Sequence, residues 1–235
     1  MRLNELVGVK KLQNFRTDEL VDFLDLYTPY KQSGRGNFSR VFEKDGEIYK
    51  FWALDPAYER FVKYCLANKG NKHLPRFLSD VKTLTAFHTR HRDHPRKLKY
   101  VKMEILEPSE IKDAFFKTIN DYLFGRPRRV SADILRTREE VYQEYEKLYG
   151  NKYQSFLETV LDVCDHVRKG ASSTFYPDIR SVNVMERDGV LVLTDPGYDE
   201  RETYDWGDIT SLEVRNPDER VSGPKRDKKT FKGTP

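Results

Sequence analysis

Apolar residues recur every three or four positions in several stretches of this chain, which is the spacing of one face of an α-helix. The pattern predicts amphipathic helices over residues 17–27, 55–68, 137–150 and 153–170, and a looser one over residues 109–124. Thr137 and Glu140 add a capping-box signature, and Gly170 is a natural helix end. The helix over residues 153–170 has the most continuous apolar face.

Short runs of β-branched and aromatic residues, bounded by turn residues, predict strands. Glycines and the Asp45-Gly46 pair divide residues 30–52 into three short antiparallel strands, and a strand pair follows at residues 81–88 and 97–106. Asp188-Gly189 predicts a hairpin between residues 184–187 and 190–194. Residues 204–213 are interpreted as one short helix.

Length and composition limit the class of protein. The chain has 235 residues, enough to bury a full core as one large domain or two small lobes. Hydrophobic residues make up 37% and charged residues 34%, and no apolar run approaches the ~20 residues of a membrane span. The first residues contain no signal-peptide block. We therefore expect no membrane partner and a cytoplasmic location.

Cysteine content and charge add two expectations. Cys65 and Cys164 fall in helical patterns, so buried, reduced thiols are expected rather than a disulfide. The net charge is +4, and residues 216–235 carry six basic against three acidic residues. The segment over residues 214–235 has almost no apolar residues, so we expect it to be a disordered tail. Its basic charge makes an acidic protein or a nucleic acid a candidate partner for this tail.

The stretch from Phe175 to Asp199 carries the most informative polar residues. Asn183 follows Asp178 by five positions, and Asp195 stands at the end of an apolar strand beyond the hairpin. This order suits phosphoryl transfer, in which one Asp orients a hydroxyl nucleophile while an Asn and a second Asp hold magnesium. The alternative is a chance spacing that ends in an ordinary turn, since Asp, Pro and Gly each favour turns.

A glycine-rich turn precedes this stretch by about half of the chain. Its residues are Gly34, Gly36, Phe38 and Val41. Glycine lets the backbone approach a phosphate closely, and consecutive N–H groups there can face the anion. A plain hairpin with a flexible tip is the alternative.

Lys50 lies on the third predicted strand in phase with Ile48 and Trp52, where a half-buried strand ordinarily carries an apolar residue. An inward lysine needs an anion, such as a nucleotide phosphate or a helix glutamate. Glu59, at the border of the apolar face of the next helix, is either that glutamate or a solvated residue. Lys50 could alternatively extend along the edge of a small sheet.

In combination these motifs resemble the protein kinase fold, over about residues 30–213. The sequences Gly-x-Gly-x-Phe-Ser and Asp-x-x-Ser-x-Asn, with a later Thr-Asp-Pro, are most similar to the small protein kinases that podophages express early in infection. The resemblance implies an α+β, bilobal protein kinase-like fold. It would comprise a small antiparallel β N-lobe (residues 1–106), a reduced helical C-lobe (residues 107–213) and the tail (residues 214–235).

The resemblance implies ATP and Mg²⁺ as cofactors. The nucleotide would contact Gly34, Gly36, Phe38, Val41, Lys50, Glu59, Met103, Glu104 and Leu106. Among these, Lys50 would bind the α- and β-phosphates, Met103 would stand at the back of the adenine pocket, and backbone groups of Glu104 and Leu106 would hydrogen-bond the base.

The catalytic roles implied by the resemblance fall on four residues. Asp178 would orient and deprotonate the acceptor hydroxyl, and Arg180 would offset charge on the transferred phosphoryl group. Asn183 and Asp195 would hold magnesium.

The chain also departs from the family. Tyr176-Pro177 replaces the His-Arg that usually precedes the catalytic Asp, Pro196 stands where Phe is usual, and no Ala-Pro-Glu follows. Activation by loop phosphorylation is therefore not expected.

The leading hypothesis is a minimal Ser/Thr protein kinase that acts on host proteins in the cytoplasm of an infected bacterium. One alternative is a small-molecule phosphotransferase of the same fold. The other is a kinase-like protein that binds a host protein or nucleic acid without catalysis, although the presence of Lys50, Asp178, Asn183 and Asp195 in one chain argues against it.

Overall fold

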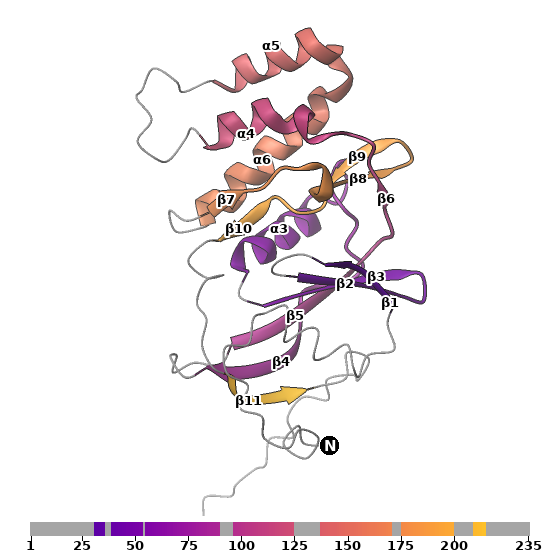
Figure 1. The fold of residues 1–235 in the computed structure, drawn as a ribbon, viewed down its shortest axis with the longest axis vertical. Coiled ribbons are helices and arrows are strands. Elements are labelled where there is room, and N and C mark those ends of the chain that lie inside the picture. The colour runs from indigo at the N-terminus through magenta and orange to yellow at the C-terminus, as the bar shows by residue number, and fades with distance from the viewer. Residues whose placement is uncertain are drawn as a thin grey trace, which may run out of the picture.

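The computed structural model describes residues 31–35, 39–53, 55–89, 96–124, 137–170, 175–199 and 209–214. Helices and small sheets occupy one end of the molecule and a large sheet the other (Figure 1). The elements are β1 (Lys31–Arg35), β2 (Ser39–Lys44), β3 (Glu47–Ala53), α3 (Pro56–Ala67), β4 (Lys82–Thr89), β5 (Arg96–Met103), β6 (Glu107–Pro108), η1 (Asp113–Phe116), α4 (Lys117–Phe124), α5 (Arg138–Tyr149), η3 (Gly150–Tyr153), α6 (Gln154–Gly170), β7 (Phe175–Pro177), η4 (Ser181–Asn183), β8 (Val184–Arg187), β9 (Val190–Leu193), β10 (Gly197–Asp199) and β11 (Ile209–Val214). Antiparallel sheets combined with helices in this way make an α+β fold.

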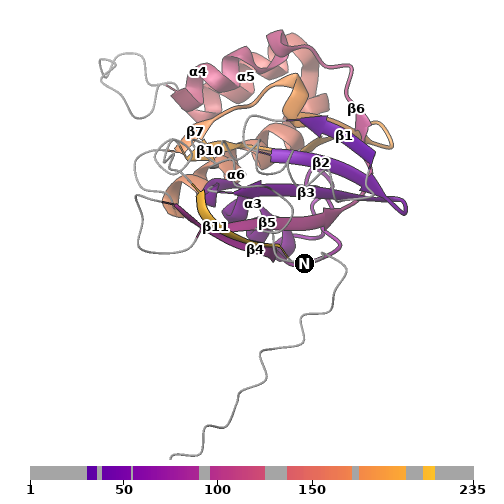
Figure 2. The ribbon, with the colours of Figure 1, turned by 60° about the horizontal axis from the view of Figure 1, so that its bottom comes forward.

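The large sheet has six strands in the order β1-β2-β3-β5-β4-β11, all paired antiparallel. Figure 2 shows them from β1, nearest to α4 and α5, to β4 and β11 at the far side. Asp45 and Gly46 both have positive φ, +53° and +77°, so the predicted turn joins β2 to β3. Several residues of β3, on both of its faces, are buried, so it is a central strand.

Helix α3 follows β3 and packs against α6 (Figure 1), and its residues Tyr58 and Glu59 contact Trp52 and Lys99 of the large sheet. Asp55 caps its N-terminus by accepting the Tyr58 N–H at 3.0 Å, and Pro56 occupies the first turn, where a missing N–H costs nothing. The apolar face consists of Ala57, Tyr58, Phe61, Val62 and Cys65, all buried. The cap and the face together fix how the helix is rotated against the sheet.

The helical part of the molecule is built on α6, whose apolar face is buried along most of its length. Helix α5 lies beside it, and the predicted capping box is confirmed, because Thr137 and Glu140 bond each other's backbone N–H groups. Arg138 then joins α5 to α6 by ion pairs to Asp162 at 2.8 Å and Asp165 at 2.7 Å. Cys65 and Cys164 are buried free thiols, as predicted.

Two small sheets connect the helices to the large sheet. The hairpin of β8 and β9 turns at Asp188 and Gly189, both with positive φ, and β6 pairs with its outer side. Strand β7 pairs with β10, in the register that sets Pro177 opposite Gly197 and Tyr176 opposite Tyr198. These sheets hold the loop between β7 and β8 next to the loop between β9 and β10.

One element differs from its prediction. The sequence predicts a short helix over residues 204–213, and this is wrong for residues 209–213, which belong to strand β11 paired with β4. Ile209, Thr210 and Val214 are β-branched, and the edge of β4 offers backbone groups that a helix would leave unpaired. Val214, the first residue of the expected tail, is the last residue of β11. The rest of that tail and the expected helix over residues 17–27 lie outside the described residues.

Two further observations bear on the expected elements. The helical region after Pro108 begins later than its pattern suggests, since residues 113–116 form a 3₁₀ turn and the α-helix starts at Lys117. Within the described parts of the chain, no helix is long and apolar enough to cross a membrane.

Candidate functional site

The loop between β7 and β8 lies against the loop between β9 and β10, and backbone hydrogen bonds join them. The Asp178 N–H donates to the Pro196 carbonyl at 3.0 Å, and the Thr194 N–H donates to the Asn183 carbonyl at 2.9 Å. Asp178, Asn183 and Asp195 are therefore brought together, as the sequence predicts. Asn183 precedes β8 and Asp195 follows β9, so both lie at the open end of this hairpin, and Asp178 follows strand β7.

Gly197 makes this close approach possible. Its φ is +134°, and an added Cβ would lie 2.1 Å from the Tyr176 carbonyl oxygen. No side chain fits there, and L-residues rarely adopt this conformation. The Gly197 N–H also donates to the Asp195 carboxylate at 3.2 Å, which fixes the direction of that side chain.

Asp178 is the centre of a small hydrogen-bond network. Its carboxylate accepts from Arg180 Nη2 at 2.5 Å and from Asn183 Nδ2 at 3.2 Å, and the same Asn183 nitrogen donates to the Asp178 carbonyl at 2.7 Å. The Asp178 side chain is half-buried, whereas that of Arg180 is 54% exposed. The ion pair with Asp178 raises the pKa of Arg180.

The start of the loop is held from the other side by η1. Asp113 accepts the Ser181 N–H at 2.7 Å, and hydrogen bonds with the side chain and then the backbone of Ser181 lower the pKa of Asp113. Asn120 on α4 donates to the Ile179 carbonyl at 2.7 Å. The loop backbone is thus fixed by residues of the helical part, and its polar side chains have a defined direction.

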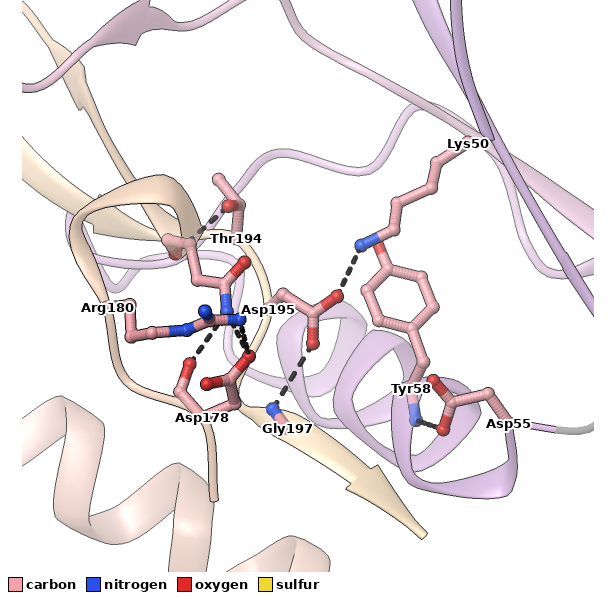
Figure 3. Close-up of polar contacts among 9 residues, drawn as sticks. Lys50, Asp55, Tyr58, Asp178, Arg180, Thr194, Asp195 and Gly197 are labelled. Atoms are coloured by element: carbon pink, nitrogen blue, oxygen red, sulfur yellow. Dashed lines mark hydrogen bonds and ion pairs between the residues drawn. The ribbon is translucent and has the colours of Figure 1, made fainter. Parts of the chain in front are cut away.

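Lys50 reaches this network from strand β3, as Figure 3 shows. Its ammonium lies 2.7 Å from the Asp195 carboxylate, 145 residues away in the sequence. Lys50 is 7% exposed, so the ion pair is largely shielded from water. The inward position of Lys50 and its need of an anion are confirmed, but the anion in the structure is Asp195 and not the glutamate of the next helix.

The ring of Tyr58 lies on another side of the lysine (Figure 3). The Lys50 ammonium is 3.8 Å from the centroid of this ring, a cation–π distance. Asp55, which caps the same helix, is buried as well. Burial first, and then the charge of Asp195, raise the pKa of Asp55 to about 7, while the Tyr58 N–H and Lys50 oppose this shift.

Glu59 does not contact Lys50. Its carboxylate forms ion pairs with Lys99 on β5 and with Lys63, one turn further along α3 at 3.1 Å. Hydrogen bonds from these two lysines lower the pKa of Glu59 against the opposing effect of partial burial. The pairing of Lys50 with Glu59 that the sequence suggested is therefore not present.

The predicted base-binding residues lie at the end of β5 and directly after it. Met103 and Leu106 are buried in the core. The Glu104 N–H donates to the Arg76 carbonyl at 3.1 Å, and the Glu104 carboxylate binds the Arg76 N–H at 2.8 Å and Arg187 at 2.5 Å. The Glu104 N–H is thus already used within the protein, which leaves its carbonyl as the group that could meet a base.

The predicted phosphate-binding turn is described in part. Gly34 belongs to β1 and pairs with Val41 of β2, next to a register shift between Gln32 and Gly34. Val41 in turn pairs with Lys50 of β3. Gly36 and Phe38 lie outside the described residues. The described part of the turn therefore lies on β1 and β2, and β2 is the direct neighbour of the strand that carries Lys50.

The donor set suits a hard cation such as magnesium. Asp195 offers carboxylate oxygens, and Asn183 uses its amide nitrogen toward Asp178, which leaves its amide oxygen as the atom for a metal. Among the described residues no group of three or more His, Cys, Asp and Glu side chains could hold a metal ion. Magnesium commonly takes only one or two protein ligands and completes its shell with phosphate and water oxygens, so two protein ligands are compatible with it.

Two residues of this site were not expected from the sequence. Tyr58 and Asp55 both lie in the predicted helix over residues 55–68, and that pattern gives neither of them a role in the site. The Asp55-Pro56 pair is a readable helix start, and it places Tyr58 in the first turn. The contact of Tyr58 with a lysine depends on tertiary packing and has no local signal.

The chain matches no protein-family model, and a search of curated proteins finds no significant match.

Proposed function

We propose that this chain is a minimal protein kinase, which transfers the γ-phosphoryl group of ATP to Ser or Thr hydroxyls of proteins. The observation that carries the proposal is the 2.7 Å contact between Lys50 and Asp195, adjacent to Asp178 and Asn183. Protein kinases use a lysine on strand β3, a metal-binding Asp, and an Asp and an Asn on the catalytic loop. The large sheet and the helical part would then be the two lobes of a kinase-like fold.

Asp178 has the surroundings of a group that orients a nucleophile. It is half-buried and held by Asn183, so its carboxylate keeps one direction while it stays accessible to an acceptor hydroxyl. A carboxylate of this kind accepts the hydroxyl proton as the new bond to phosphorus forms, a contribution of ~10²–10⁴ in rate.

Arg180 is suited to a charge-balancing role. Its guanidinium bonds Asp178 at 2.5 Å but remains 54% exposed, so it can turn toward a second anion without leaving the site. A fixed cation beside the transferred group stabilises the charge that develops there.

Lys50, Asn183 and Asp195 are suited to hold the nucleotide and its metal. Mg²⁺, when bound, neutralises charge on the β- and γ-phosphate oxygens. Lys50 is buried and pre-oriented, so it can bind the α- and β-phosphates with little loss of side-chain entropy. Asp195 and Asn183 supply the oxygen ligands. The absence of a Lys50–Glu59 pair is a departure from the usual kinase arrangement.

The setting of the proposal comes from the sequence. The motifs that resemble the early kinases of podophages suggest host proteins as substrates and the cytoplasm of an infected bacterium as the place of action. No described observation favours the small-molecule phosphotransferase or the non-catalytic binding protein.

The test is phosphoryl transfer from γ-³²P-labelled ATP with Mg²⁺ to proteins of a bacterial extract. We compare the wild type with Asp178→Asn and Lys50→Met, and use Asp188→Asn as the control, since Asp188 is exposed in a turn where Asn is equally favourable. We expect labelled bands with acid-stable, alkali-labile phosphate that disappear with the first two variants and remain with the third. Label only in small molecules, or no transfer by a folded wild type, refutes the proposal.

A further inference from the structure

The ammonium group of Lys50 has two close partners of different chemistry. One is the Asp195 carboxylate at 2.7 Å, and the other is the face of the Tyr58 ring at 3.8 Å from its centroid (Figure 3). Tyr58 is 1% exposed. A cation held against an aromatic face and shielded from water is attracted more strongly than one at the surface.

The Tyr58 ring is held rigidly. The rings of Trp52 and Tyr58 pack edge to face, with 4.9 Å between centroids and an interplanar angle of 72°, and the centroid of the Phe61 ring lies 5.8 Å from that of Tyr58. Asp55 binds the Tyr58 N–H, so the first turn of α3 is capped at the residue that carries the ring. The ring therefore presents the same face to Lys50 whatever happens at Asp195.

The hydroxyl group of Tyr58 does not make this contact. It is buried and has no hydrogen-bond partner among the described residues. Burial raises the pKa of Tyr58 well above its usual value, so the phenol is neutral. The ring face is thus the part of Tyr58 that meets the lysine, and phenylalanine offers the same face.

Glu59 is on the wrong side of the helix to replace this contact. Successive residues of an α-helix differ by about 100° in direction, so when Tyr58 faces the core its neighbour faces the flank. There Glu59 is engaged by Lys63 and Lys99. Lys50 has no carboxylate partner from α3 among the contacts that the structure shows.

We infer that Tyr58 is the positioning residue for Lys50, and that its ring face takes the place of the helix glutamate of other protein kinases. The inference rests on the proposed function. Lys50 would lose the Asp195 carboxylate when a metal ion binds that carboxylate, whereas it would keep its contact with the Tyr58 ring. A neutral ring also leaves the lysine with its full charge toward phosphate oxygens.

The first measurement needs no catalysis. In protein labelled with ¹³C-lysine, the ε-CH₂ signal of Lys50, assigned by its loss in Lys50→Arg, is expected to move upfield because of the ring current of Tyr58. Tyr58→Phe should keep this shift, and Tyr58→Leu should lose it. The shift should also persist when Mg²⁺ and ATP are added. An unshifted Lys50 signal in the wild type overturns the inference, even if Tyr58→Leu does not fold.

The second measurement separates positioning from general stability. For Tyr58→Leu we expect the KM for ATP to rise about tenfold, which corresponds to the loss of one cation–π contact, while Tyr58→Phe stays within about twofold of the wild type. A folded Tyr58→Leu protein with an unchanged KM overturns the inference. If the wild type shows the ring-current shift but neither binds ATP nor transfers phosphate, the proposed function fails and the Tyr58–Lys50 contact stands.

Discussion

Asp55 gives the most direct test of the electrostatics of this site. The residue is 7% exposed, its carboxyl group lies near Lys50 and Asp195, and burial is the largest cause of its raised pKa of about 7. In the unfolded chain the same group titrates at about 3.8. We predict that Asp55→Asn removes a pH dependence of stability that the wild type shows between pH 4 and pH 7.

The sign and the size follow from proton linkage. The folded protein holds the Asp55 proton to higher pH than the unfolded chain does. The stabilisation that comes from this bound proton is therefore fully present below about pH 4 and is lost as pH rises to about 7. A difference of about 3 pKa units corresponds to ~4 kcal/mol over the full range, of which ~2.5 kcal/mol falls between pH 5 and pH 8. Above about pH 8 the ionisation of Asp55 should no longer change the free energy of unfolding.

The assay is urea unfolding of the wild type and of Asp55→Asn at pH 5 and at pH 8. Asn caps a helix as well as Asp does, so the variant keeps the bond to the Tyr58 N–H. Between pH 5 and pH 8 the free energy of unfolding of the wild type should fall by ~2.5 kcal/mol more than that of Asp55→Asn, which corresponds to roughly 5–10 °C in Tm. Asp188→Asn, the same change at an exposed turn, should show no such difference from the wild type. Parallel pH profiles for wild type and Asp55→Asn refute the reasoning.

Three further predictions concern stability. Gly197→Ala should destabilise the protein by about 3 kcal/mol or more in chemical unfolding, because its Cβ would collide with the Tyr176 carbonyl. Burial lowers the pKa of His73, whose ring bonds the Leu191 carbonyl and the Ser155 hydroxyl. The stability that neutral His73 contributes to the fold is therefore present above about pH 6.5 and is lost as pH falls. In urea unfolding, His73→Gln should reduce the change in the free energy of unfolding between pH 7 and pH 5. Leu157→Ala, in the core, should cost ~2–5 kcal/mol, and Leu148→Ala, 60% exposed, less than ~0.5 kcal/mol, by urea unfolding.

Most helices and strands of the described chain could be predicted because their signals are local. The hairpin turns at residues 45–46 and 188–189 have the positive φ that an Asp-Gly pair favours, and the capping box at Thr137 is present. Helix α6 begins and ends within a residue of its predicted bounds. Periodicity, caps and turns all act within a few residues, so they can be read without knowledge of the fold.

The elements that were missed depend on distant partners. Strand β11 exists because β4 offers an edge more than 100 residues earlier in the chain, and the short strands β7 and β10 form only as a pair around Gly197. In isolation, three residues such as 175–177 or 197–199 carry no strand signal. Long-range pairing decides such segments, and local propensity does not.

The same limit explains the partner of Lys50. The sequence indicates that a lysine at this inward position needs an anion, and this follows from burial alone. It does not indicate which anion, because the choice depends on the rotation of α3. Asp55 caps the helix at a position that directs Tyr58 inward and Glu59 toward Lys99, and the backbone conformation of Gly197 directs Asp195 toward the strand. A one-residue shift of that cap would turn the helix by about 100° and bring Glu59 near the direction that Tyr58 now has. Whether the helix offers Lys50 a carboxylate or an aromatic ring is therefore set by the start of a helix five residues after the lysine.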